Sequence, residues 1–93
     1  MKTIWKFPVF GPRRYTTRMP AGAEILSVQE QGDDVQMWAL VDPSQPDEPR
    51  TFQGFGTGHP VDAVIVKYLD TLQFDGGDLI FHFFEVEPGK GGA

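Results

Sequence analysis

The chain has 93 residues, no cysteine and a formal net charge of −5. This length predicts one domain with a single hydrophobic core, and the absence of cysteine excludes disulfides and thiolate metal sites. No apolar segment approaches the roughly 20 residues of a membrane helix, and the N-terminus lacks an apolar stretch of signal-peptide length. We therefore expect a cytoplasmic protein with no membrane partner.

Positive and negative charges are separated along the chain. Residues 1–18 contain five basic residues and no acidic residue, whereas the rest of the chain contains three basic and all thirteen acidic residues. The body of the domain therefore has a net charge of −10, which repels nucleic-acid phosphates and favours a basic partner. A second interpretation is that the carboxylates only keep a small domain soluble.

The N-terminal residues show two alternating segments. Residues 3–7 place Trp5 and Phe7 on one face, which predicts an opening strand that is ended by a proline. A Gly-Pro turn at residues 11–12 follows, and residues 14–19 then alternate with basic side chains on the outer side. We expect these two strands to pair as a hairpin.

Residues 35–42 have the clearest strand pattern. One face of this segment is wholly apolar and consists of Val35, Met37, Ala39 and Val41. The other face is apolar only in its middle, so we expect a strand that lies inside a sheet. Residues 24–30 are its expected hairpin partner, with Leu26 and Val28 on one face, and residues 31–34 are expected to form the turn.

The second half of the chain begins with an interrupted segment. Residues 42–49 contain three prolines and three acidic residues, so we expect an exposed loop before a short strand at 51–55. Apolar residues then recur at helical spacing, which predicts one short amphipathic helix near residues 60–69. Residues 71–86 are predicted to form a closing hairpin around a turn at 75–78.

These elements predict a mainly β fold. Six or seven short strands with one short helix are typical of an antiparallel sandwich or a half-open barrel. The globular domain is expected over residues 1–87, and residues 88–93, which are rich in glycine, are expected to form a flexible C-terminal tail.

The sequence shows no catalytic constellation. Residues 54–60 resemble a phosphate-binding loop, but they lack the Lys-Ser/Thr ending, so we interpret them as a bulged strand end and a turn. His59 and His82 are the only histidines. We expect His82 to be a partly buried, hydrogen-bonded residue, and no nucleophile motif accompanies His59. The sequence therefore predicts no enzyme activity, no metal site and no cofactor.

Five segments resemble, in this order, a family of small phage and prophage proteins that is a domain of unknown function. These segments are residues 1–7, 19–28, 38–42, 56–60 and 81–85. The resemblance extends from residue 1 to about residue 86, so it covers nearly the whole chain. It implies an origin in a mobile element and a location in the cytoplasm of a bacterial host, and it supplies no catalytic residue.

We therefore expect a non-enzymatic binding protein. The most concrete version is an inhibitor of a host defence complex, of the anti-CRISPR type, whose acidic face binds a basic surface on a host or phage protein complex. The protein would act as a monomer or a homodimer, without direct contact to nucleic acid. The candidate contacts lie in predicted turns and loops and are Asp33, Asp34, Asp42, Asp47, Glu48, Asp75 and Asp78.

The alternative is an accessory protein that binds nucleic acid or another ligand through the basic N-terminal hairpin. Arg13, Arg14 and Arg18 would contact phosphates in this case. Trp5, Trp38, Tyr15 and Tyr68 could stack on bases, although such residues also serve as core. Salt-dependent binding of nucleic acid distinguishes the two functions.

Overall fold

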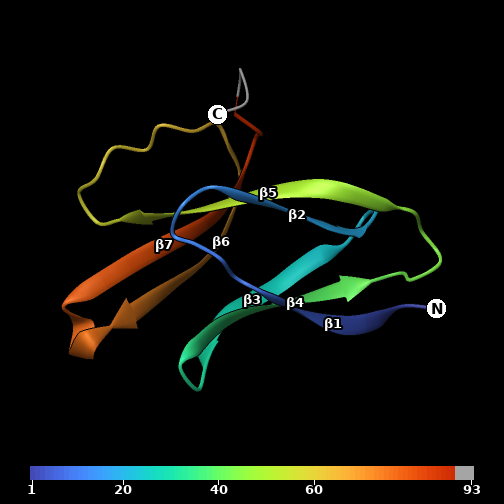
Figure 1. Cartoon of the computed structure of the whole chain (residues 1–93), viewed down its shortest axis with the longest axis horizontal. Helices are drawn as coiled ribbons and strands as arrows, with labels where there is room; N and C mark the ends of the chain where they lie inside the picture. Colours follow the sequence, from blue (N-terminus) through green and yellow to red (C-terminus); the bar gives the residue numbers. More distant parts are fainter. Residues whose placement is uncertain (90–93) are drawn as a thin grey trace.

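A computed structural model describes residues 1–89, which form two antiparallel sheets (Figure 1). The strands are β1 (Thr3–Pro8), β2 (Tyr15–Pro20), β3 (Glu24–Gln31), β4 (Asp34–Val41), β5 (Asp47–Gly56), β6 (Ile65–Phe74) and β7 (Leu79–Val86). The three-stranded sheet has the order β1-β4-β3, and the four-stranded sheet has the order β2-β5-β7-β6, without closure into a barrel. The predicted mainly β, antiparallel fold is confirmed. Residues 90–93, which belong to the predicted tail, lie outside the described residues.

The prediction of a strand inside a sheet is confirmed for β4, which pairs with β1 on one side and with β3 on the other. Met37, Ala39 and Val41 are at most 1% exposed. They pack with residues from the facing sheet, including Met19, Phe52, Leu72 and Phe83. One core between the two sheets therefore stabilises the domain, as expected for a chain of this length.

The hairpin of β3 and β4 is also confirmed, but the predicted inner face of β3 is wrong. The register shifts between Ile25 and Ser27, so Leu26 is an extra residue in a β-bulge. Ile25 and Val28 are buried as a result, whereas Leu26 is 46% exposed. A bulge moves the following side chains to the opposite face, and strict alternation does not anticipate it.

The predicted N-terminal hairpin is wrong, because β1 and β2 belong to different sheets. β1 pairs with β4, and β2 pairs with β5. The connecting segment bonds to both sheets: the Val9 amide donates to the Val35 carbonyl (3.0 Å), and the Gly54 amide donates to the Pro12 carbonyl (2.9 Å). This segment therefore crosses between the sheets instead of turning back on one of them.

The predicted helix near residues 60–69 is wrong, since residues from Ile65 onward form strand β6. The only helical element among residues 1–89 is a 3-10 turn at Asp75–Gly77. Register shifts after Ile65 and after Tyr68 each insert one residue into β6. Two bulges three residues apart place Ile65, Tyr68 and Thr71 on one face, and this spacing of three resembles a helix. The β-branched residues at 64–66 favour the strand.

The exposed loop predicted for residues 42–49 is shorter than expected, because β5 begins at Asp47. Pro49 pairs with Arg18 of β2, while pairing of β5 with β7 begins only at Thr51. Proline is tolerated there because β5 has a neighbour on only one side at this point. The closing hairpin of β6 and β7 is confirmed: β7 has the predicted bounds, and β6 begins earlier than predicted, at Ile65.

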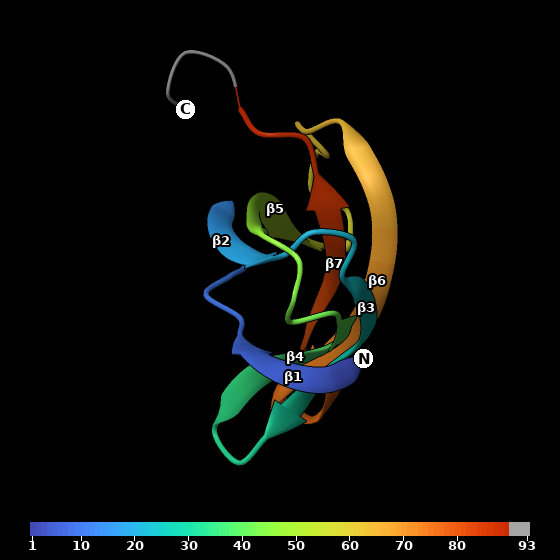
Figure 2. The ribbon, with the colours of Figure 1, turned by 90° about the vertical axis from the view of Figure 1, so that its right-hand side faces the viewer.

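The two sheets meet along β3 and β6, which lie side by side (Figure 2). The Asp70 carboxylate on β6 accepts a hydrogen bond from the Val28 amide on β3 (3.1 Å). It also accepts from the Gln29 side-chain amide (3.4 Å) and from the Thr71 backbone amide (3.0 Å). One side chain therefore joins two strand edges that share no continuous ladder.

We expect Asp70→Ala to destabilise the domain by about 1–3 kcal/mol, because the part-buried Val28 amide loses its acceptor. Asp70→Asn retains an acceptor oxygen and should lose less. Urea unfolding measures the effect as a lower midpoint at unchanged slope. An Asp70→Ala midpoint equal to that of the wild type would contradict this role.

Candidate acidic interface

The seven candidate carboxylates occupy three segments of the chain. Asp33 and Asp34 lie at the turn between β3 and β4, Asp75 and Asp78 lie at the turn between β6 and β7, and Asp42, Asp47 and Glu48 lie in and after the loop between β4 and β5. The two turns lie at the same end of the molecule, and the loop lies at the opposite end (Figures 1 and 2). The seven residues therefore form two groups and not one face.

Backbone conformation fixes the two turns at the acidic end. The β3–β4 turn has two loop residues, the first of which, Gly32, has a φ of 61°. Glycine adopts this conformation without strain. In the β6–β7 turn, Asp75, Gly76 and Gly77 have φ values of 51°, 66° and 100°. The Asp78 amide closes this turn on the Asp75 carbonyl at 3.2 Å. Both turns are therefore tight, and they fix the backbone from which these carboxylates project.

We define the acidic end as Asp33, Asp34, Asp75 and Asp78, all of which are exposed. Within residues 1–89, no ion pair involves any of these four carboxylates. The segments 28–36 and 70–80 contain no lysine or arginine. The Lys6 ammonium group donates to the side chain of Gln31, which pairs with Asp34, at 2.7 Å. The acidic end therefore carries negative charge that the described residues do not neutralise.

In the other group, the carboxylates of Asp42 and Glu48 accept hydrogen bonds from within the chain. Asp42 Oδ1 accepts from the Ser44 amide (3.0 Å) and from the Ser44 hydroxyl (2.7 Å). These hydrogen bonds lower the pKa of Asp42 and form the Asx-type turn that opens the loop. Asp47 is exposed, and its backbone carbonyl accepts from the Arg18 guanidinium at 3.2 Å.

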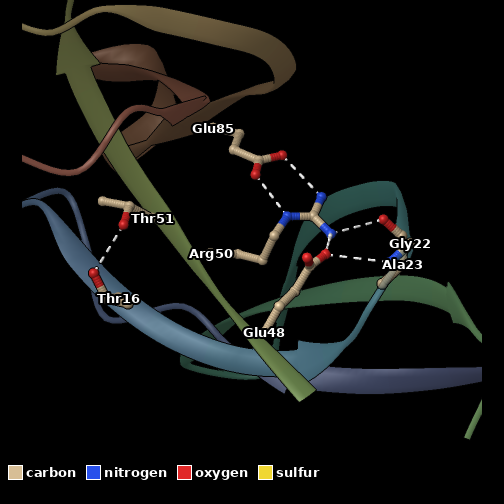
Figure 3. A network of polar contacts seen from close by, with 7 residues as sticks. All are labelled: Thr16, Gly22, Ala23, Glu48, Arg50, Thr51 and Glu85. Atoms are coloured by element: carbon tan, nitrogen blue, oxygen red, sulfur yellow. Dashed lines mark hydrogen bonds and ion pairs between the residues drawn. The ribbon is translucent and has the colours of Figure 1, made fainter. Parts of the chain in front are cut away.

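Glu48 belongs to a network around Arg50 (Figure 3). Arg50 Nε and Nη2 donate to the two carboxylate oxygens of Glu85 at 2.6 and 2.9 Å, and Nη1 donates to the Ala23 carbonyl at 2.9 Å. Glu48 Oε2 lies 3.8 Å from Arg50 Nη1 and accepts from the Gly22 amide at 3.2 Å. The hydrogen bonds to Glu85 raise the pKa of Arg50. Glu48 is therefore structural, and its charge is partly neutralised.

Two of the three N-terminal arginines of the alternative hypothesis form hydrogen bonds within the chain. Arg14 donates to the Gln53 side chain (2.9 Å) and to the Asp62 carbonyl (3.3 Å). Arg18 bonds to the Asp47 carbonyl, as described above. Arg13 is exposed, and no hydrogen bond or ion pair among residues 1–89 involves its side chain. The structure thus leaves one of the three arginines available to a ligand.

His82 lies on the outer face of the four-stranded sheet between two threonine hydroxyls. Thr57 Oγ1 lies 2.8 Å from His82 Nε2, and Thr71 Oγ1 lies 3.0 Å from Nδ1. The expectation of a partly buried, hydrogen-bonded histidine is confirmed. Residues 57–59 form a turn after β5, as predicted, in which the His59 amide donates to the Gly56 carbonyl at 3.1 Å.

Among residues 1–89, no three histidine, cysteine, aspartate or glutamate side chains come together in a way that could hold a metal ion. None of the helical residues described forms a segment with the length and apolar character needed to cross a bilayer. The fold and the site together define a small two-sheet β protein with an unneutralised acidic end.

The family model described as a domain of unknown function (DUF7352) matches residues 1–92, and the chain belongs to this family. No curated protein and no solved structure matches the chain. The predicted membership of a family of unknown function is confirmed.

Proposed function

We propose that this protein is a small, phage-encoded, non-enzymatic inhibitor that binds a basic surface of a host defence complex, of the anti-CRISPR type, in the bacterial cytoplasm. The observation that carries this proposal is the acidic end. Four exposed carboxylates on two tight turns take part in no ion pair among the described residues, so they remain available to a basic partner.

The electrostatics favour a protein partner that normally binds nucleic acid. RNA-guided complexes hold their nucleic acid in positively charged channels. A protein with a net charge of −5 and an exposed group of carboxylates is attracted to such a channel over a distance of about one Debye length, roughly 8 Å at physiological ionic strength. A backbone that is already ordered in tight turns loses little conformational entropy on binding. The acidic end therefore resembles, in charge and rigidity, a short segment of phosphate backbone.

Cleavage of target DNA by a purified RNA-guided complex tests the proposal. We expect addition of the wild-type protein to inhibit cleavage when it is added before the target, with weaker inhibition as salt is raised. A panel of such complexes is needed, because the electrostatic argument specifies the surface and not the system. Full cleavage by every complex at saturating protein would overturn the proposal.

A further inference from the structure

A second feature of the molecule borders the acidic end, because His59 and Phe81 also line a neighbouring hollow that contains Asp78. An open groove of about 500 Å³ lies between the segment that precedes β2 and the loop that follows β5. Its lining includes Arg13, Gly54, Gly56, His59, Asp62 and Phe81. This volume falls in the usual range for small-molecule sites, roughly 300–1,000 Å³. The groove thus joins the segment of Arg13 to the glycine-rich segment at residues 54–60.

Hydrogen bonds hold both rims of the groove. On one rim, the Gly54 amide donates to the Pro12 carbonyl at 2.9 Å, next to Arg13. On the other rim, the Thr57 hydroxyl lies 2.8 Å from His82 Nε2, which fixes the turn that carries His59. The groove is therefore formed before any ligand arrives, and a ligand does not have to order it.

Two glycines of β5 allow the rims to approach the strand. A Cβ atom on Gly56 would lie 2.9 Å from His59 Nδ1, and a Cβ atom on Gly54 would lie 3.1 Å from the Pro12 side chain. The first distance is shorter than real Cβ atoms accept and the second is tight, so a side chain at either position would have to displace its neighbour. The place of the His59 ring thus depends on the missing side chain of Gly56.

The polar groups of the groove suit an anion at one end. Arg13 and His59 line the groove, and neither side chain takes part in a hydrogen bond or ion pair within residues 1–89. A guanidinium presents a fork of donors that matches phosphate oxygens, and an imidazole adds a further donor. Asp62 also lines the groove, with its Oδ1 3.5 Å from the Gln53 amide nitrogen. Its negative charge opposes an anion, so the phosphate belongs on the Arg13 side.

Apolar residues line the rest of the groove, among them Pro12, Pro60 and Phe81. A flat ring can pack against such a surface without hydrogen bonds of its own. From these observations we infer that the groove binds a mononucleotide, with the phosphate on Arg13 and His59 and the base against the apolar lining. This site goes beyond the proposed function, because none of the four carboxylates of the acidic end lines the groove.

Titration of the 15N-labelled full chain with AMP, followed by NMR, tests this inference. We expect the amides of Gly54, Gly56 and His59 to shift with a common dissociation constant. Arg13→Ala should weaken AMP binding about tenfold, as for the loss of a charge-assisted hydrogen bond. Arg18→Ala removes the same charge from an arginine that bonds to the Asp47 carbonyl, and should leave AMP binding unchanged.

Two more variants separate binding from folding. Gly56→Ala should displace His59 and weaken binding, with the spectrum showing whether the sheet is intact. Asp62→Asn should tighten binding, because it removes the opposing charge, and a merely structural role of Asp62 would not produce this gain.

Inorganic phosphate and adenosine should each bind at least about tenfold more weakly than AMP. Shifts that are absent with AMP, unchanged in Arg13→Ala, or equal for phosphate and AMP would overturn the inference.

Discussion

Arg50→Ala is expected to destabilise the domain by about 3 kcal/mol and to lower the melting temperature by roughly 12–24 °C. The Arg50 and Glu85 side chains are only 15% and 13% exposed. Removal of the guanidinium leaves the Glu85 carboxylate buried without a cation and the Ala23 carbonyl without a donor. The network joins β5 to β7 and to the turn before β3, so its loss affects both sheets. Thermal unfolding followed by circular dichroism measures this effect.

Two controls distinguish loss of the ion pair from loss of a large side chain. The double variant Arg50→Met/Glu85→Leu replaces both charges by apolar groups and should recover most of the stability, because no unpaired charge remains. Arg18→Ala truncates an exposed arginine of β2 and should change stability by less than about 0.5 kcal/mol. A melting temperature for Arg50→Ala within a few degrees of the wild type would show that the network is not important for stability.

Reversing the charge of the acidic end is expected to weaken binding to a basic partner strongly. The variant Asp33→Lys/Asp34→Lys/Asp75→Asn/Asp78→Lys turns attraction into repulsion and should weaken binding at least about 100-fold at physiological salt. Asparagine is chosen at position 75 because Asp75 has a positive φ, which asparagine tolerates. Binding of an inhibited defence complex, measured by surface plasmon resonance, checks the result.

The chain offers a matched pair of single variants for the same question. Asp34 and Asp47 are both exposed and are the first residues of β4 and β5, but they lie at opposite ends of the molecule. Asp34→Lys and Asp47→Lys change the net charge equally. We expect only Asp34→Lys to weaken binding markedly. Equal losses in the two variants would show that the partner senses the overall charge and not the acidic end.

Sequence reasoning succeeded where the chain alternates strictly. The apolar face of β4 was predictable because Met37, Ala39 and Val41 follow the two-residue period of a regular strand. The β6–β7 turn was predictable because residues 75–78 consist of aspartate and glycine, which accept the left-handed conformation. Local chemistry determines both features, so no knowledge of distant contacts is needed.

Sequence reasoning failed where the backbone departs from alternation or crosses between sheets. Bulges in β3 and β6 changed the phase of the side chains, which exposed Leu26 and gave β6 a helix-like spacing. The partner of β1 was misassigned because the choice between β2 and β4 depends on non-local contacts. The β-branched residues at 64–66 were the one signal that favoured a strand over the predicted helix.

The candidate site was predictable only in part. Turn chemistry correctly placed exposed carboxylates at both acidic turns. Asp42 accepts a hydrogen bond from Ser44, which is close in sequence. Glu48 contacts Arg50 and the β2–β3 turn, and these two contacts depend on how the strands pack. Arg13 and His59 line the same groove although they are more than 40 residues apart in the sequence, so no local sequence pattern predicts the groove.

Competition with target DNA tests the proposed function most directly. A purified RNA-guided complex that carries its guide is titrated with the wild-type protein, first without target DNA and then with saturating target. If the acidic end occupies the nucleic-acid channel, the protein binds the free complex, and target DNA displaces it. Equal affinity for the free and the target-bound complex would contradict the proposal that the protein occupies this channel.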